Sequence, residues 1–308
     1  MKPTSSYVFE KGMPYPETTM FGAIKIAAER TPDAPALDFM GKVTSYRTFL
    51  EKIEAVAKAF VNYGLKEGDV VTICMPNTPQ AVICLYALNR IGAIANMVHP
   101  LSSQKNITYY LDYSESKMIL TLDMFYEKVK AAIGESKTNA TVITARIEEE
   151  LSFIKATAFK YIKNKPNHKF PNDERDFLWS DFMKTGEGVE LPEVVYDKSK
   201  TAVILYSGGT SGTPKGIMLS DFNFNALGYQ VAEITGCSMG NGIKFLSVMP
   251  VFHGFGLGIG IHTVLEHGAM CILIPIFNEE SYAKAKKVIS KEMAALWEMI
   301  AYERKQAD

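Results

Sequence analysis

Apolar side chains in the first third of the chain recur at the spacing of an amphipathic helix. The clearest set occupies one helical face: Phe49, Leu50, Ile53, Val56, Ala57, Phe60 and Val61. Gly64 follows at the place where such a helix needs a residue in the left-handed conformation. Thr78 and Pro79 are typical of a helix start, as N-cap and first-turn residue. We expect further helices that begin at Ser102 and that cover 123–133.

Short apolar runs rich in β-branched residues separate these helices. They predict strands at 70–75, 93–98, 117–122 and 140–145. Because strands that alternate with single helices need crossover connections, a parallel sheet with helices on both faces is the economical arrangement. The alternation resumes near residue 196, with strand-like runs at 201–206, 215–220, 244–249 and 269–274. This part also contains a helix over 221–235, a glycine-rich stretch at 254–260 and a helical segment at 279–305.

This order of elements predicts an α/β fold that is doubly wound, with mostly parallel sheets flanked by helices. A chain of 308 residues is expected to form two domains or one large α/β unit. We expect a first α/β subdomain at 1–195, with a linker near 146–195, and a second α/β subdomain at 196–308.

The segment from 146 to 200 interrupts the alternation. One face of a predicted helix carries Leu151, Ile154, Ala158, Phe159 and Ile162. Lysines surround this face: Lys155, Lys160, Lys163 and Lys165. Two interpretations stay open, an ordinary amphipathic helix followed by a surface linker, or a helix over 148–165 in weak contact with an anionic membrane surface. The first is the more common, because a charged helix face is normally solvated.

Composition and charge exclude several classes of protein. The 33 basic and 34 acidic side chains give a formal net charge of −1, whereas proteins that bind nucleic acids normally show a basic excess. A hydrophobic fraction of 47% fits a large buried core. The cysteines have no metal-type spacing and are expected to be reduced core residues: Cys74, Cys84, Cys237 and Cys271. The N-terminus does not resemble a signal peptide and no apolar run is long enough to cross a bilayer, so we expect a cytoplasmic protein.

The segment YSGGTSGTPKG, residues 206–216, carries the most specific chemistry of the sequence. Its glycines allow successive backbone N–H groups to point inward as a nest for phosphate oxygens. Its hydroxyl side chains add donors and Lys215 adds positive charge, so the composition favours a phosphate-binding loop. The segment does not fit the Walker pattern, because Pro214 precedes the lysine and a strand-like run follows it. A flexible hairpin loop is the simpler alternative.

Residues 206–220, YSGGTSGTPKGIMLS, closely resemble the phosphate-binding signature of the AMP-forming adenylating superfamily, which includes acyl-CoA synthetases. Other segments agree and occur in family order: TSYRTFLEKI at 44–53, YALNRIGAIANMVHPLSS at 86–103 and VMPVFHGFGLGIG at 248–260. The similarity extends from about residue 20 to about residue 280 and is greatest to fatty acyl-CoA ligases. It implies an incomplete N-terminal domain of an adenylate-forming enzyme.

The resemblance also implies a reaction. Such enzymes join a carboxylate to the α-phosphate of ATP, release pyrophosphate, and pass the acyl group to the thiol of coenzyme A. The implied cofactors are ATP, Mg²⁺ and coenzyme A, and the implied acid is a fatty acid. The implied phosphate contacts are Ser207, Gly208, Gly209, Thr210, Ser211, Gly212, Thr213 and Lys215. Lys215 and Thr210 are the catalytic candidates. Lys215 is expected near the β- and γ-phosphates. Either Thr210 or Thr213 could help to place Mg²⁺, and the sequence does not choose between them.

The same resemblance assigns Phe252, His253 and Gly254 to binding of the acid. Taken alone, a histidine in an apolar stretch is more often a satisfied core residue. The glycines between 254 and 260 are expected to leave room for an acyl chain, in which each buried methylene contributes about 0.8 kcal/mol. The other histidines lack metal-ligand spacing and are expected to be structural or exposed: His99, His168, His262 and His267.

Beyond residue 280 the resemblance weakens. The sequence lacks the family's Tyr-Gly-x-Thr-Glu motif, its ribose-binding aspartate and its C-terminal lid domain with the adenylation lysine, and 291–308 is predicted to be a continuous helix. Two functions stay open. The first is a truncated acyl-CoA ligase of low or no activity, and the second is a non-catalytic nucleotide- or acyl-binding fragment that acts with a partner chain.

Overall fold

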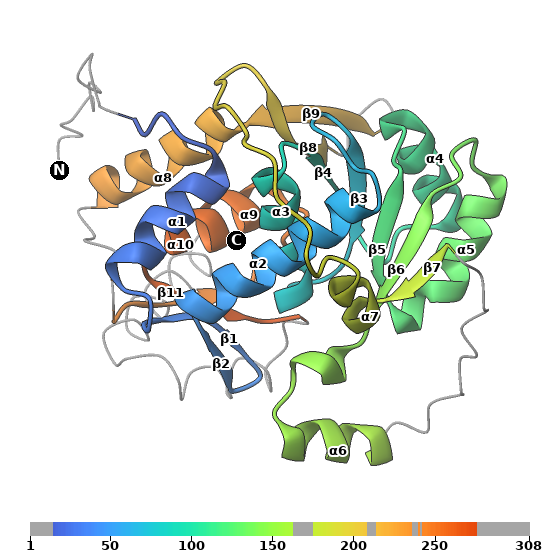
Figure 1. Cartoon of the computed structure of the whole chain (residues 1–308), viewed down its shortest axis with the longest axis horizontal. Coiled ribbons are helices and arrows are strands. Elements are labelled where there is room, and N and C mark those ends of the chain that lie inside the picture. Colours follow the sequence, from blue (N-terminus) through green and yellow to red (C-terminus); the bar gives the residue numbers. More distant parts are fainter. Residues whose placement is uncertain (1–14, 163–174, 208–213, 236–239, 241, 276–308) are drawn as a thin grey trace, which may run out of the picture.

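The computed structural model describes residues 15–162, 175–207, 214–235, 240 and 242–275 (Figure 1). A seven-stranded sheet has the strand order β7-β6-β5-β3-β4-β8-β9, in which only the β8–β9 pair is antiparallel. Its strands are β3 (Val70–Cys74), β4 (Ile94–Met97), β5 (Met118–Leu122), β6 (Thr141–Ala145), β7 (Asp176–Leu178), β8 (Thr201–Ser207) and β9 (Lys215–Ser220). The sheet confirms the predicted α/β class with mostly parallel strands.

A second sheet has four strands in the order β10-β11-β1-β2. Its strands are β1 (Pro35–Phe39), β2 (Lys42–Ser45), β10 (Lys244–Ser247) and β11 (Met270–Leu273). Strands β1 and β2 form an antiparallel hairpin, and β1 pairs in parallel with β11 from the far end of the described chain. The two sheets therefore do not divide the chain at residue 195, because each contains strands from both sides of that position.

Helices fill the space between the sheets and cover the outer face of the larger one (Figure 1). Helix α2 (Tyr46–Asn62) contacts β1 and β2, helix α3 (Pro79–Arg90) contacts β3 and β4, and the two helices pack on each other. On the opposite face, α4 (Gln104–Ser114) and α5 (Tyr126–Glu135) bury apolar side chains against β5. Helices on both faces are what a doubly wound sheet requires.

The remaining helices are shorter or lie at the edges of the molecule. They are α1 (Met20–Arg30), α6 (Phe153–Ile162), α7 (Trp179–Lys184), α8 (Asp221–Thr235), α9 (Gly254–Leu257) and α10 (Val264–Glu266), with 3₁₀ turns at Asp123–Phe125 and Ile147–Glu150 and a π-helix at Gly258–Thr263. The glycine-rich stretch at 254–260 thus belongs to a helix. None of the helices in the described ranges is long and apolar enough to span a bilayer.

Local capping chemistry explains where the helices begin and end. The Thr78 hydroxyl accepts a hydrogen bond from the N–H of Ala81, and Pro79 occupies the first turn, as predicted. Gly64 has a φ of 90°, which confirms its left-handed position after α2. The start predicted at Ser102 is wrong by one residue, because the Ser103 hydroxyl accepts from the N–H of Asn106 and caps α4.

Several predictions concern residues outside the described ranges, namely the helix at 279–305, Cys237 and His168. The other cysteines, Cys74, Cys84 and Cys271, are buried free thiols, as expected. The chain also has three strands that the sequence analysis did not predict: β1, β2 and β7. They are only three to five residues long and include charged positions, so their apolar pattern is weak.

Glu266 is an ionisable side chain buried at the end of α10, next to two histidines. Its carboxyl oxygens lie 3.6 Å from Nε2 of His262 and 3.8 Å from Nδ1 of His267. In the part of the chain that the structure describes, neither oxygen has a hydrogen-bond partner. Burial raises the pKa of Glu266 to about 9 and lowers the pKa of His262 to about 3. Both groups are therefore neutral near pH 7, and His262 is a structural residue that bonds to Tyr86 and Asn225.

We predict that Glu266→Gln stabilises the protein at neutral pH. The unfolded chain loses the Glu266 proton near pH 4.5 and the folded chain near pH 9, so the wild type loses about 1.4 kcal/mol of stability per pH unit between these values. The amide does not titrate, so the advantage of the variant grows from pH 5 to pH 9 in denaturant unfolding curves. Glu233→Gln, on an exposed side chain, is the control. Parallel pH profiles of wild type and Glu266→Gln would contradict the assignment.

Candidate functional site

The carboxyl ends of β4 and β8 define the candidate site. These strands are neighbours in parallel register, with Ala95 opposite Val203 and Asn96 opposite Ile204. After β4 the chain returns to β5, which lies on the β3 side of the pair, and after β8 it continues to β9, which lies on the opposite side of the pair. In open α/β sheets, ligands bind outside the carboxyl ends of strands at such a reversal.

The predicted phosphate-binding loop connects β8 to β9 at this place. Ser207, the last residue of β8, is directly opposite Lys215, the first residue of β9. Residues directly opposite each other in an antiparallel pair point to the same face, so the Ser207 hydroxyl and the Lys215 amine share one side of the hairpin. The other predicted phosphate contacts lie outside the described residues: Gly208, Gly209, Thr210, Ser211, Gly212 and Thr213. The phosphate-binding role of the loop stays a prediction.

Tyrosines of α4 contact the hairpin residues on both sides of the loop. The Tyr109 hydroxyl donates a hydrogen bond of 3.1 Å to the Pro214 carbonyl. The ring centroids of Tyr110 and Tyr206 are 4.2 Å apart. A Cβ placed on Gly216 would lie 3.0 Å from the ring of Tyr113, so a glycine allows the strand to approach that ring. The sequence analysis did not identify these tyrosines, although Tyr109 and Tyr113 are one helical turn apart.

The predicted acid-binding residues lie at the start of α9, beside the same strand ends. His253 is exposed and caps α9, because its Nδ1 accepts a 3.2 Å hydrogen bond from the N–H of Phe255. The ring of Phe252 is 4.4 Å from the ring of His99, which follows β4. An ideal Cβ on Gly254 would lie 3.7 Å from Leu205 of β8. The structure thus places Phe252, His253 and Gly254 next to the ends of β4 and β8.

Asn77, in the turn between β3 and α3, fixes the segment that leads to His253. Its side-chain N–H groups donate to the carbonyls of Ser247 and Met249, each at 2.9 Å. Its carbonyl oxygen accepts a 2.7 Å hydrogen bond from the N–H of Val251. The side chain is almost fully buried, so these bonds form away from competing water. Sequence reasoning missed Asn77, whose partners are about 170 residues away.

The predicted room for an acyl chain beside the glycines is not confirmed at two of them. A Cβ on Gly256 would lie 2.0 Å from the Pro250 carbonyl, and one on Gly258 would lie 2.6 Å from Leu227. Gly256 therefore allows α9 to pack closely on the loop before it, and Gly258 allows the π-helix to pack closely on α8. His99 is exposed, and partial desolvation of its ring lowers its pKa. Its Nδ1 accepts a 2.9 Å hydrogen bond from the N–H of Leu101, and its exposure fits the expectation of a structural or exposed residue.

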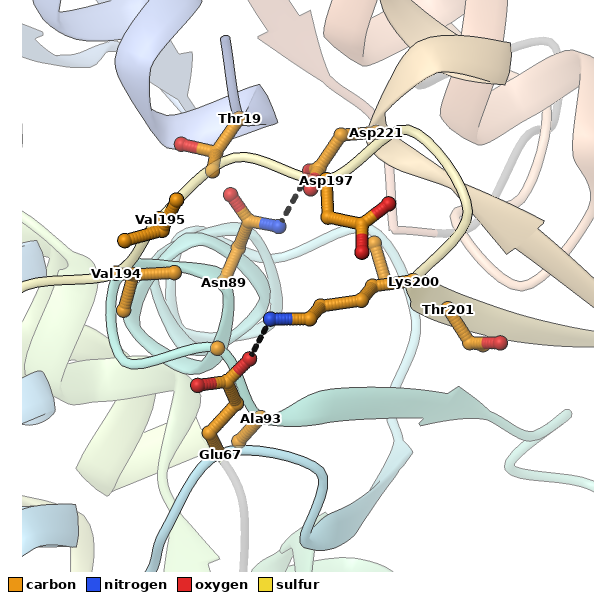
Figure 2. A pocket seen from close by; sticks show the side chains of 12 residues that line it. Thr19, Glu67, Asn89, Ala93, Val194, Val195, Asp197, Lys200, Thr201 and Asp221 are labelled. Atoms are coloured by element: carbon orange, nitrogen blue, oxygen red, sulfur yellow. Dashed lines mark hydrogen bonds and ion pairs between the residues drawn. The ribbon is translucent and has the colours of Figure 1, made fainter.

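A small polar pocket lies at the opposite end of the same strands (Figure 2). Asp221 accepts hydrogen bonds from the N–H of Met20 and from the Asn89 side chain, at 2.8 and 2.7 Å. Lys200 forms an ion pair with Glu67. These charged groups are partnered within the pocket, which joins α1, α3 and α8 and does not contribute to the candidate site. Across the described ranges no three His, Cys, Asp or Glu side chains form a metal-binding group.

Parallel sheets with a glycine- and hydroxyl-rich connection at the carboxyl ends of their strands are common among nucleotide-binding α/β proteins. The family model for the AMP-binding enzyme matches residues 24–299, so the chain belongs to the AMP-binding enzyme family. This confirms the resemblance seen in the sequence.

Long-chain-fatty-acid–CoA ligases are among the relatives of the chain. It is 28% identical over 288 residues to the Bacillus subtilis (strain 168) ligase, covering 92% of this chain and 50% of that one. It is 30% identical over 261 residues to the Salmonella typhimurium ligase, covering 80% and 45% of the two chains. A long-chain-fatty-acid–CoA ligase structure from Archaeoglobus fulgidus has the same fold, with a TM-score of 0.72 at 23% identity, over 89% of this chain and 50% of that one. The chain therefore spans about half the length of these relatives.

We predict that Asn77→Ala destabilises the protein and displaces the 247–253 segment. The substitution leaves two buried carbonyls and one N–H without their partner, at a cost of about 2–4 kcal/mol in the free energy of unfolding. Denaturant unfolding measures this loss. Asn106→Ala, on the exposed surface of α4, is the control. An unchanged free energy of unfolding for Asn77→Ala would contradict the role of this side chain.

Proposed function

We propose that the chain supplies the ATP-phosphate and acid-binding groups of an AMP-forming acyl-CoA ligase that activates a fatty acid. The observation that carries the proposal is the placement of Ser207 and Lys215, at the two ends of the loop, beside the strand ends that also contact Phe252 and Gly254. Family membership and the fatty-acid ligases among the relatives support the same reaction class.

In this reaction a carboxylate oxygen attacks the α-phosphorus of ATP, the bond to the β-phosphate breaks, and pyrophosphate leaves. The thiol of coenzyme A then attacks the acyl carbon and AMP leaves. Negative charge grows on the departing pyrophosphate, so donors already oriented toward the β- and γ-phosphates lower the barrier. The backbone N–H groups and hydroxyls of 207–213 and the Lys215 ammonium supply such donors in this proposal.

Mg²⁺ prefers oxygen ligands and is commonly held by phosphate oxygens together with one or two protein groups. Hydroxyl groups of the loop fit this preference, and Thr210 and Thr213 are the candidates. The chemistry that Mg²⁺ supplies is neutralisation of phosphate charge. The fatty acid would lie beside Phe252 and His253, with its carboxylate toward the loop.

We predict that Lys215→Ala weakens binding of Mg-ATP by about 10- to 100-fold, because it removes a charge-assisted contact to phosphate. Isothermal titration calorimetry with Mg-ATP measures the change. Lys198→Ala, on another exposed lysine, is the matched control and should bind as the wild type does. Equal affinity of Lys215→Ala and wild type would remove Lys215 from the phosphate site.

We predict that His253→Ala weakens binding of the fatty acid about tenfold while binding of Mg-ATP stays unchanged. His253 also caps α9, so His253→Asn, which retains a capping acceptor, separates the two roles. Reduced acid binding in both variants supports contact of the ring with the acid. Reduced binding in the alanine variant alone assigns His253 to capping, and a change in Mg-ATP binding alone would overturn the placement.

Release of AMP decides between the two functions that the sequence leaves open. The test incubates the chain with Mg-ATP, coenzyme A and fatty acids of graded length, with Lys215→Ala beside it. AMP that forms only with acid and wild-type protein supports the ligase. Binding of ATP and acid without AMP favours the alternative, a non-catalytic binding protein that acts with a partner chain.

A further inference from the structure

Strand β9 begins at Lys215 and lies at the edge of the larger sheet, where it pairs with β8 alone among the described strands. Three of its six residues are exposed: Lys215, Ile217 and Met218. An edge strand with little buried surface has few contacts that fix its position, and such segments open easily. The start of β9 therefore depends on support from outside the sheet.

The β8–β9 hairpin has two faces with different neighbours. Side chains alternate along a strand, so Leu205 and Ser207 share one face of β8 and Tyr206 lies on the other. Leu205 lies beside Gly254 of α9, whereas Tyr206 contacts the tyrosines of α4. Lys215 is directly opposite Ser207 and shares its face. Lys215 therefore belongs to the face toward α9, and α4 packs on the opposite face.

From this opposite face, α4 contacts both ends of the loop. At the first end it packs on Tyr206, the residue directly before Ser207. At the second end, the Tyr109 hydroxyl donates its 3.1 Å hydrogen bond to the Pro214 carbonyl. That carbonyl belongs to the peptide unit whose nitrogen is that of Lys215, and a peptide unit is planar. The hydrogen bond from Tyr109 therefore fixes the plane from which the Lys215 backbone starts.

Buried hydroxyl and amide groups fix α4 itself to the sheet. The Ser114 hydroxyl, at the end of α4, accepts a 3.0 Å hydrogen bond from the Asn96 side chain of β4. The same Asn96 amide donates to the Thr72 hydroxyl of β3 at 2.8 Å, and the Ser116 hydroxyl bonds to both Thr72 and Ser114. All four side chains are buried, so water does not compete for these bonds. The cluster joins α4 to β3 and β4, and the tyrosines of α4 project from a fixed base.

We propose that Tyr109 is a positioning residue for Lys215 and orients it toward the β- and γ-phosphates of ATP. The inference rests on the function proposed above, in which Lys215 binds those phosphates. A charged group favours binding most when it is already oriented toward its ligand, because ATP then has less of the loop to order. Tyr109 acts through the Pro214 carbonyl and the backbone of β9.

Hydrogen–deuterium exchange of the ligand-free chain tests the contact itself. Tyr109→Phe removes the hydroxyl and retains the ring, so exchange in peptides covering 207–216 should become about 3- to 10-fold faster, as expected for the loss of one hydrogen bond. Tyr63→Phe is the matched control, because it removes a tyrosine hydroxyl that bonds to Thr141 of β6, away from the hairpin. Unchanged exchange in 207–216 for Tyr109→Phe would overturn the proposal, whether or not the chain binds ATP.

A double-mutant cycle with Mg-ATP, measured by isothermal titration calorimetry, tests the link to Lys215. Tyr109→Phe alone should weaken binding about 3- to 10-fold, and Tyr63→Phe should bind as the wild type does. In the Lys215→Ala background, Tyr109→Phe should change the affinity by less than about twofold. An equal effect of Tyr109→Phe in both backgrounds would contradict the proposal, because the tyrosine would then support the loop without acting on Lys215.

The phosphate site and the positioning role fail in different ways. Wild-type affinity of Lys215→Ala, or no binding of Mg-ATP by the folded wild type, contradicts the phosphate site and leaves Tyr109 with a structural role alone. Weaker binding by Lys215→Ala together with unchanged binding by Tyr109→Phe keeps the phosphate site and excludes the positioning role. Circular dichroism checks that each variant is folded.

Discussion

The parallel pairing of β4 with β8 is the constraint on which the candidate site depends. It places the end of β4, which His99 follows, beside the end of β8, although more than 100 residues separate the two strands along the chain. The Ser207–Lys215 register then brings the two ends of the glycine-rich loop together. Without this pairing, the end of β8 and the first residue of β9 would not lie beside the segment that follows β4.

Buried polar side chains hold the third segment of the site in place. Asn77 binds three backbone groups between Ser247 and Val251, and this fixes the approach of α9 to the strand ends. Asp221 and Asn89 make a similar connection at the opposite end of the sheet. A buried polar group without a hydrogen-bond partner destabilises the fold by its full desolvation free energy. Such contacts therefore favour one arrangement of the segments over alternatives. The apolar core contributes much of the free energy of folding, and these buried amide and carboxyl side chains fix how the chain segments are oriented relative to one another.

Sequence patterns predicted the elements whose signal is local. Strands such as β5 and β6 are continuous apolar runs, and Thr78 with Pro79 marks a helix start within four residues. The strands β1 and β2 were missed because short segments with Asp38 and Lys42 show little alternation. Asn77 and the tyrosines beneath the hairpin were missed for another reason: their partners are distant in sequence, so no local pattern identifies them. The exposure of Ile154 shows that helical periodicity does not reveal whether a neighbour covers a face.

The central claim is that the β8–β9 loop holds ATP phosphates beside an acid site at the start of α9. Hydrogen–deuterium exchange read by mass spectrometry tests it most directly, because it reports backbone N–H groups along the whole chain. The account predicts that Mg-ATP slows exchange in peptides covering 207–216 and that a fatty acid slows exchange in peptides covering 252–258. Protection by Mg-ATP at other segments, with unchanged exchange in 207–216, would contradict it.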